Sequence, residues 1–161
     1  MIVNEVIGNI YTDDSKKWMS HSVDYLELEW YELNKRILRK HTLGNQEVGI
    51  QFEGGAASLA DGDVLAEFED MVIVIKVKAD ECMAIIASNN YELARMCYEI
   101  GNRHAPLFID EHDDKRLLLP KDKPLQLLLE KMGFNPIIVK ARLIKPLSAA
   151  KGHQHNHNHE Y

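Results

Sequence analysis

The sequence has little of what several common classes of protein require. Only two of its 161 residues are cysteines, Cys82 and Cys97, and they lie too far apart for a Cys-x-x-Cys motif. We expect both to be reduced, as small buried hydrophobic side chains. The first residues contain no basic segment followed by an apolar run, so neither secretion nor membrane insertion is expected. The predicted location is therefore the cytoplasm.

Positive charge is also scarce. The chain contains 19 basic and 25 acidic residues, which gives a formal net charge of −6. A phosphate backbone is bound by a basic surface, and this composition does not provide one. Nucleic acid is therefore excluded as an expected partner.

Motifs of common enzymes are missing from the sequence. It has no His-Glu-x-x-His, no Gly-x-Ser-x-Gly and no phosphate-binding Gly-x-x-x-x-Gly-Lys-Ser/Thr. Its cysteines and histidines also lack the paired spacing of a closed structural zinc site, which favours an open or shared metal site. We therefore expect a protein that is not an enzyme.

The first half of the chain has the pattern of short strands separated by turns. Asp24–Trp30 alternates, with Leu26, Leu28 and Trp30 on one face. Val48–Phe52 continues this pattern, and Met71–Val77 is a β-branched run typical of a buried strand. The sequence predicts a β-rich N-terminal domain over residues 1–76.

Two helices are predicted in the second half. Asn89 is the N-cap of the first, with Glu92 three positions later. Asp122 and Pro124 begin the second, and Gly133 ends it. Both helices carry one apolar face at the spacing i, i+3, i+4 and i+7, formed by Leu93, Met96, Cys97 and Ile100 in the first and by Leu125, Leu128, Leu129 and Met132 in the second.

Strands are predicted around these helices. They are Cys82–Ala87, the hairpin of Pro106–Ile109 and Lys115–Leu119, and Pro136–Ile144. The resulting order, strand, helix, strand, strand, helix, strand, is that of a ferredoxin-like βαββαβ domain, placed at residues 77–147. The fold class predicted from the whole sequence is α+β.

Residues 148–161 form a histidine-rich tail with nothing to pack into a core, so the sequence predicts a disordered segment. Four histidines alternate with Gln or Asn there: His153, His155, His157 and His159. Imidazole is a suitable ligand for nickel, copper and zinc, and a flexible segment can place several around one ion. A purification tag, or a polar tail rich in histidine by chance, remains the alternative interpretation.

Two further histidines are candidate ligands. His104 lies four residues beyond Ile100 and would extend the apolar face of the first helix if Gly101 does not end that helix. From spacing alone, it would ordinarily be a hydrogen-bonded core residue. His112 lies in an acidic turn between the two strands of the hairpin, where carboxylates could add oxygen ligands or simply be solvated.

Three segments of the chain carry a family resemblance. They are Tyr98-Glu-Ile-Gly-Asn-Arg-His-Ala-Pro-Leu107, Leu28-Glu-Trp-Tyr-Glu-Leu-Asn-Lys-Arg-Ile-Leu-Arg39 and Leu59-Ala-Asp-Gly-Asp-Val-Leu65. Together with the histidine-bearing tail, they resemble the urease accessory nickel chaperones of the UreE family. The resemblance extends from about residue 20 to the end of the chain.

The resemblance implies a peptide-binding-like first domain, a ferredoxin-like metal-binding second domain, and a cytoplasmic homodimer that delivers Ni(II) to apo-urease. It makes His104 an interface ligand donated by both protomers, with His112 a looser match. The implied partners are the urease apoprotein and its accessory proteins, including a GTPase. Zn(II) and Cu(II) are possible competitors of Ni(II).

Two other functions stay open at this point. One is a histidine-rich nickel or zinc storage protein without a dedicated acceptor. The other is a peptide-binding interaction module in which the metal serves only to join the dimer.

Overall fold

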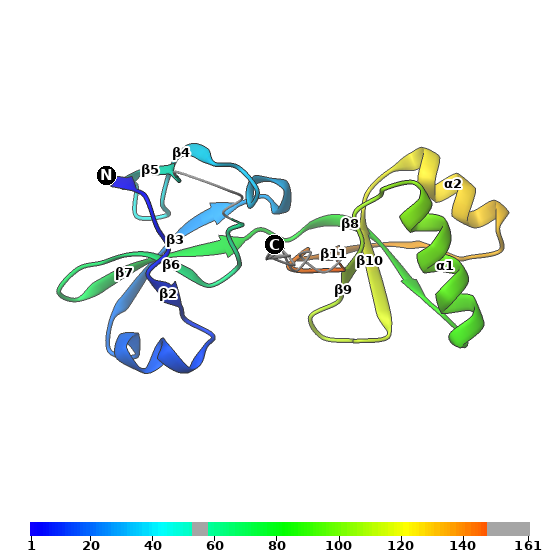
Figure 1. The fold of residues 1–161 in the computed structure, drawn as a ribbon, viewed down its shortest axis with the longest axis horizontal. Helices are drawn as coiled ribbons and strands as arrows, with labels where there is room; N and C mark the ends of the chain where they lie inside the picture. The colour runs from blue at the N-terminus through cyan, green and yellow to red at the C-terminus, as the bar shows by residue number, and fades with distance from the viewer. Residues whose placement is uncertain (53–57, 148–161) are drawn as a thin grey trace, which may run out of the picture. The chain divides into compact units, whose positions relative to one another are not determined.

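A computed structural model describes residues 1–52 and 58–147 of the chain. The chain divides into two compact units. The first unit comprises Met1–Asp80 with Lys140–Ile144, and the second comprises Glu81–Val139 with the residues from Lys145 onward. Strands predominate over two α-helices in the described part, so the predicted α+β class is confirmed (Figure 1). The predicted tail, with its four histidines, lies outside the described residues.

The first unit is built from two sheets and two short 3-10 helices. The larger sheet has the order β2-β6-β7-β3, and the smaller has the order β1-β5-β4. The strands of the larger sheet are β2 (Gly8–Asn9), β6 (Asp63–Glu67), β7 (Met71–Val77) and β3 (Ser22–Leu28). Those of the smaller are β1 (Ile2–Val3), β5 (Glu47–Gln51) and β4 (Ile37–His41), and the 3-10 helices are η1 (Asp13–Trp18) and η2 (Trp30–Glu32).

The predicted strand over Met71–Val77 is confirmed as β7. It is central in its sheet, where β3 pairs with it in parallel, with Leu26 opposite Ile75. Side chains from both sheets form one hydrophobic core, which includes Leu26, Leu28, Val48, Ile50, Ile73 and Ile75. Central parallel pairing buries both faces of a strand, which accounts for a continuous apolar run instead of an alternating one.

The predicted strand over Asp24–Trp30 is only partly correct. Strand β3 begins at Ser22 and ends at Leu28, and Trp30 begins η2. The chain turns there, and two hydrogen bonds hold the turn. The Glu29 amide donates to Oε2 of Glu32 at 3.0 Å, and the Glu32 amide donates to Glu29 O at 2.9 Å. Trp30 therefore does not continue the face of Leu26 and Leu28.

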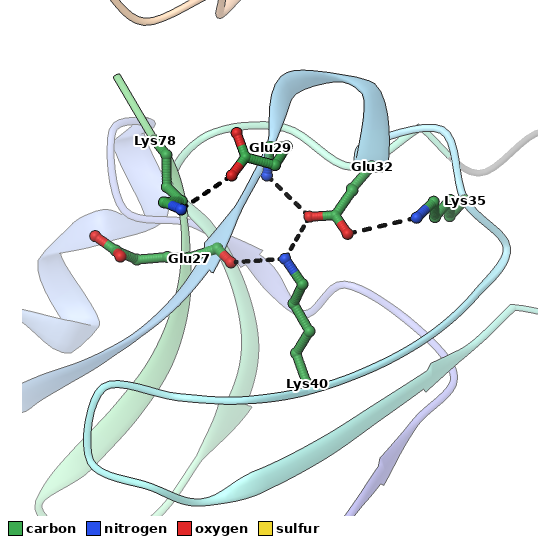
Figure 2. A network of polar contacts seen from close by, with 6 residues as sticks. All are labelled: Glu27, Glu29, Glu32, Lys35, Lys40 and Lys78. Atoms are coloured by element: carbon green, nitrogen blue, oxygen red, sulfur yellow. Dashed lines mark hydrogen bonds and ion pairs between the residues drawn. The ribbon is translucent and has the colours of Figure 1, made fainter. Parts of the chain in front are cut away.

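Glu32 joins this turn to the strands around it (Figure 2). Its side chain is 6% exposed and contacts the ammonium groups of Lys35 and Lys40. Burial by itself raises the pKa of Glu32, but hydrogen bonds from Lys40, the Glu29 amide and Lys35 outweigh burial, and the pKa lies below its ordinary value. The charged carboxylate thus fixes η2 against β4.

The second unit follows the predicted order of strands and helices. Its elements are β8 (Asp80–Ile86), α1 (Asn90–Asn102), β9 (Phe108–Ile109), β10 (Arg116–Pro120), α2 (Lys123–Lys131), β11 (Ile137–Ala141) and β12 (Lys145–Pro146). The strands form one sheet in the order β11-β8-β10-β9-β12. Both predicted N-caps are confirmed, because Asn89 accepts the Glu92 amide at 2.9 Å and Asp122 accepts the Leu125 amide at 2.8 Å.

The apolar faces of both helices pack on one side of this sheet. Met96 and Ile100 of α1 and Leu129 of α2 are fully buried, in a core with side chains of β8 and β10. Cys97, Leu128 and Met132 are partly buried at its edge. The face predicted for α2 is therefore confirmed, and that of α1 is confirmed except for Leu93, whose side chain is 38% exposed.

The predicted last strand, Pro136–Ile144, is too long. β11 ends at Ala141, and Arg142 turns toward the first unit, to which residues 140–144 belong. The chain then forms β12, which pairs antiparallel with β9, with Pro146 opposite Phe108. A two-residue strand containing a proline has no detectable sequence signal, so β12 was not predicted.

Candidate metal centre

The end of α1 determines how His104 is presented. The helix ends at Asn102, and His104 adopts the left-handed conformation, with φ of 53°. The His104 amide donates to Gly101 O at 2.9 Å, and the Ala105 amide donates to Ile100 O at 3.4 Å. This pair of bonds is a Schellman motif, in which the left-handed position usually belongs to glycine.

Helix α2 ends with the same motif and does use glycine. Gly133 has φ of 87°, its amide donates to Glu130 O at 3.0 Å, and the Phe134 amide donates to Leu129 O at 3.0 Å. A residue with a Cβ is disfavoured at such a position, by on the order of 1 kcal/mol. Strained backbone of this kind is concentrated at functional sites, so His104 is marked as a candidate by its conformation as well as by its motif.

The structure decides between the alternatives that the sequence left open here. Gly101 is inside α1 and does not end it, and the helix stops before His104. The His104 side chain is exposed, not buried in the core. A histidine that leaves the helix axis and faces solvent is available as a ligand, which a core histidine is not.

Gly101 is an unexplained glycine within α1. A Cβ at this position would meet no atom within 4 Å, and its φ is not positive. Neither packing nor backbone conformation inside the described chain therefore requires glycine, although glycine in a helix interior costs about 1 kcal/mol relative to alanine. Tyr91 and Tyr98, on the outward side of the same helix, are 78% and 67% exposed.

The chain that leads into the tail runs beside the segment that follows His104. Strand β12 pairs with β9, and the Leu147 amide donates to Leu107 O at 2.7 Å. The pairing is antiparallel, so β12 runs toward residue 107, which is only three residues from His104. The last described residue, Leu147, is therefore bonded to a residue only three positions from His104.

His112 lies on the turn between β9 and β10. Its side chain is 80% exposed, and Nε2 lies 3.7 Å from Oε1 of Glu111. Its amide donates to Oδ1 of Asp110 at 2.8 Å. The imidazole is accessible, but its described surroundings hold it in no fixed geometry.

Asp110 fixes this turn. It is 1% exposed, and Oδ2 accepts from Arg116 Nη2 at 2.7 Å and from Nε at 2.9 Å. Burial raises the pKa of Asp110, but the hydrogen bonds from the His112 amide and Arg116 outweigh it, and the pKa lies below its ordinary value. The burial of Asp110 was not predicted, because one carboxylate in a polar turn carries no sequence signal that distinguishes it from its neighbours.

No group of three or more histidine, cysteine or acidic side chains suited to hold one ion is found within residues 1–52 and 58–147. The structure therefore does not bring His104 and His112 together in one such group. His153, His155, His157 and His159 lie outside the described residues. A complete site that uses His104 would need ligands from the tail, from a second copy of the chain, or from both.

Other groups contribute little to a metal centre. Cys82 is buried and Cys97 is half-buried, neither forms a disulfide, and burial raises the pKa of Cys97. A cavity of about 310 Å³ lies at the N-terminal end of α1, opposite to His104, and no histidine lines it. No helix within the described residues has the length and apolar character of a membrane-spanning segment.

Comparison with known proteins places this geometry in context. The chain matches two family models, UreE urease accessory protein, N-terminal domain, over residues 3–78, and UreE urease accessory protein, C-terminal domain, over residues 74–161. The urease accessory protein UreE of Acetivibrio thermocellus is 41% identical over 160 residues, covering 99% of this chain and 100% of that protein. UreE of Halalkalibacterium halodurans is 35% identical, covering 98% and 100%. UreE of Actinobacillus pleuropneumoniae is 35% identical, covering 94% and 81%.

The class that these matches define is that of accessory proteins of urease, as distinct from urease itself. Both family models and the relatives agree over nearly the whole length. The chain belongs to the UreE family of urease accessory proteins, and the resemblance drawn from its sequence is confirmed.

Proposed function

We propose that this protein is a nickel metallochaperone, which collects Ni(II) and delivers it to apo-urease during assembly of the metallocentre. The observation that carries the proposal is His104, an exposed imidazole in the left-handed position where α2 has Gly133. A protein keeps a strained non-glycine residue at a solvent-facing helix end when its side chain has a use there. Family membership supports urease as the enzyme that is served.

The proposed carrier is a homodimer in which His104 of each protomer binds one ion across a two-fold axis. A symmetric interface puts the same residue on both sides, so one histidine per chain supplies two ligands. Gly101 supports this arrangement, because the open space at its Cβ allows another chain to approach the end of α1 closely. The exposed Tyr91 and Tyr98 provide apolar area on the same helix.

The tail histidines are the proposed collecting arm. His153 is six residues beyond Leu147, and six residues span at most about 20 Å. Leu147 itself bonds to Leu107, which is three residues from His104. Each of the tail histidines 153, 155, 157 and 159 can therefore reach an ion at His104 of the same chain. His112, exposed on its turn, is proposed as an auxiliary ligand.

Incomplete coordination suits delivery. An ion held by a few imidazoles leaves positions open, so the ligands of an acceptor replace those of the donor one at a time. We expect Zn(II) and Cu(II) to compete, since imidazole binds all three ions. The proposed acceptors are the urease apoprotein and its accessory proteins, including a GTPase, in the cytoplasm.

We further propose that three parts of the chain have different tasks. Residues 77–147 would be a ferredoxin-like domain for metal binding and dimerisation, which the sheet order β11-β8-β10-β9 supports. Residues 1–76 would be a β-rich, peptide-binding-like domain, and residues 148–161, which lie outside the described part, the histidine-rich collecting arm. A histidine-rich storage protein remains the second candidate, because the tail could bind several ions without any acceptor.

Association with the urease machinery distinguishes delivery from storage. The full chain, with and without nickel, is used to capture proteins from an extract that contains urease and its accessory proteins. We expect capture of these proteins to increase with nickel and to decrease in His104→Ala, while His41→Ala, which changes another exposed histidine, leaves it intact. If no urease or accessory protein is captured with or without nickel, storage is favoured. If capture is the same with and without nickel, an interaction module is favoured.

A further inference from the structure

The turn formed by Ala60–Asp63 is fixed on all sides by hydrogen bonds. The Gly62 amide donates to Ile75 O at 2.9 Å, and Asp63 Oδ2 accepts from the Ala60 amide at 2.7 Å. Asn9 Nδ2 donates to Asp61 O and to Asp63 Oδ1, both at 3.0 Å. These bonds attach the turn to β7 and to Asn9 within the first unit.

Glycine is required at position 62 by both backbone conformation and packing. It has φ of 86°, and a Cβ would lie 2.4 Å from the ring of Tyr11. The tyrosine ring therefore lies directly against the turn. Burial and the charge of Asp61 raise the pKa of Tyr11, and the charge of Arg142 and its hydrogen bond lower it. The pKa lies above its ordinary value.

Asp61 is bonded to two segments that are distant in sequence. Its Oδ1 accepts from the amide of Val77, the last residue of β7, at 2.7 Å. Its Oδ2 accepts from Nη1 of Arg142 at 3.0 Å. The side chain of Asp61 is 6% exposed and that of Arg142 is 25% exposed, so this ion pair is largely shielded from solvent.

The ion pair joins Asp61 to a segment that is distant in sequence and that lies along the chain between two parts of the second unit. Arg142 lies in the return segment, residues 140–144, which belongs to the first unit although the chain before and after it belongs to the second. Val77 lies just before the first passage of the chain into the second unit, after Asp80. The chain passes between the two units after Asp80 and again around the return segment. Asp61 is bonded to a first-unit residue near each of these passages, Val77 and Arg142.

We propose that Asp61 and Arg142 form a latch that holds the return segment on the first unit. Asp61 is its fixed part, and the return segment, which leads to β12 and the C-terminal residues, is the part that opens. Opening separates a guanidinium from a buried carboxylate, so the return segment stays in place while the pair is intact. The proposal is independent of which metal the protein carries.

Hydrogen exchange of the full chain, followed residue by residue, tests the latch. In Arg142→Met, and separately in Asp61→Asn, the exchange rates of residues 142–144 are expected to rise by a factor on the order of 100, because a shielded ion pair has lost one partner. Exchange of Ile73 and Ile75, inside β7, is expected to stay within about twofold of the unchanged chain. Arg142→Lys, which keeps the charge but loses the planar guanidinium, should give an intermediate rise.

Arg39→Met is the matched control. Arg39 pairs with Glu47 at 3.2 Å in the same unit, but both side chains are exposed, so its removal should leave residues 142–144 unchanged. Unchanged exchange of residues 142–144 in both Arg142→Met and Asp61→Asn would overturn the latch. An equal rise in β7 and in the return segment would also overturn it, since the pair would then contribute only to global stability.

Discussion

His104 is the central residue of the proposed metal site. Two substitutions at this position distinguish the effect of losing the imidazole from the effect of relieving the left-handed backbone strain. His104→Gly removes the ligand and also relieves the left-handed strain, so we expect it to raise the free energy of unfolding by about 0.5–1 kcal/mol. His104→Ala removes the ligand but keeps the strain, so its stability should stay close to that of the unchanged chain. Both variants should lose nickel binding at the folded domain. Urea denaturation and nickel titration of the two variants check this pair of outcomes.

A different result would reassign His104. If His104→Gly were as stable as or less stable than the unchanged chain in the absence of metal, the imidazole would be making a stabilising contact within the protein. Its unusual conformation would then have a structural explanation and would not support a role as a metal ligand.

Asp110 supplies a pH-dependent prediction. Its pKa is lowered in the folded protein, so its stabilising effect is fully present above the unfolded carboxyl pKa and is lost as the pH falls through the lower folded value. Asp110→Asn should therefore destabilise the protein at pH 7, by on the order of 3 kcal/mol, because Arg116 loses a buried partner. The difference should shrink as the pH falls below about 4. Urea denaturation across this pH range measures it.

The exposed Asp114 on the same turn is the matched control. Asp114→Asn should leave the stability at pH 7 nearly unchanged. A difference between Asp110→Asn and the unchanged chain that did not depend on pH would show that the charge of Asp110 is not what stabilises the turn.

At the scale of elements, we expect alanine substitutions at the two helix glycines to change stability in opposite directions. Gly101 and Gly133 both have open space where a Cβ would be, but only Gly133 has positive φ. Gly101→Ala should stabilise the isolated protomer by about 1 kcal/mol through helix propensity, whereas Gly133→Ala should destabilise it by about 1 kcal/mol. Thermal or urea unfolding at low protein concentration measures both.

The same Gly101→Ala variant tests the proposed dimer. If a second chain approaches the end of α1 closely, the added methyl group should weaken dimerisation in sedimentation experiments even though the protomer is more stable. A dimer of unchanged affinity would place the interface elsewhere.

The helices show what the sequence could predict and where it failed. N-caps and apolar spacing are local signals, so both starts, the buried face of α2 and that of α1 apart from the exposed Leu93 were predicted correctly. The stop of α2 was also predicted, since Gly133 is the residue that its conformation requires. The stop of α1 was missed because His104 occupies that conformation against its own preference.

The strands show a second limit. Strand β7 was predicted to the residue, because it is central and its apolar run is continuous. Short strands such as β2 and β12 depend on partners distant in sequence, and two residues carry too little pattern to indicate them. The return of the chain through Arg142 depends on Asp61, 81 residues earlier, so no local signal could place it.

At the scale of the whole molecule, we propose that capture and holding of the metal are separate tasks. In this proposal the tail histidines capture Ni(II), and a site centred on His104 holds it until transfer. The candidate ligands of the tail, and His104 and His112, were all identified from the sequence. The relation between them depends on the pairing of β12 with β9, which only the structure supplies.

The central claim is tested most directly by titrating nickel and zinc into the intact chain, a version that ends at Ala150, and His104→Ala in that shorter version. The account predicts that the intact chain binds the most nickel, that the shorter version keeps a site, and that His104→Ala abolishes that site. His41→Ala in the shorter version should keep it. If the shorter version with His104 intact binds no nickel, the site on the folded domain does not exist and the account is wrong.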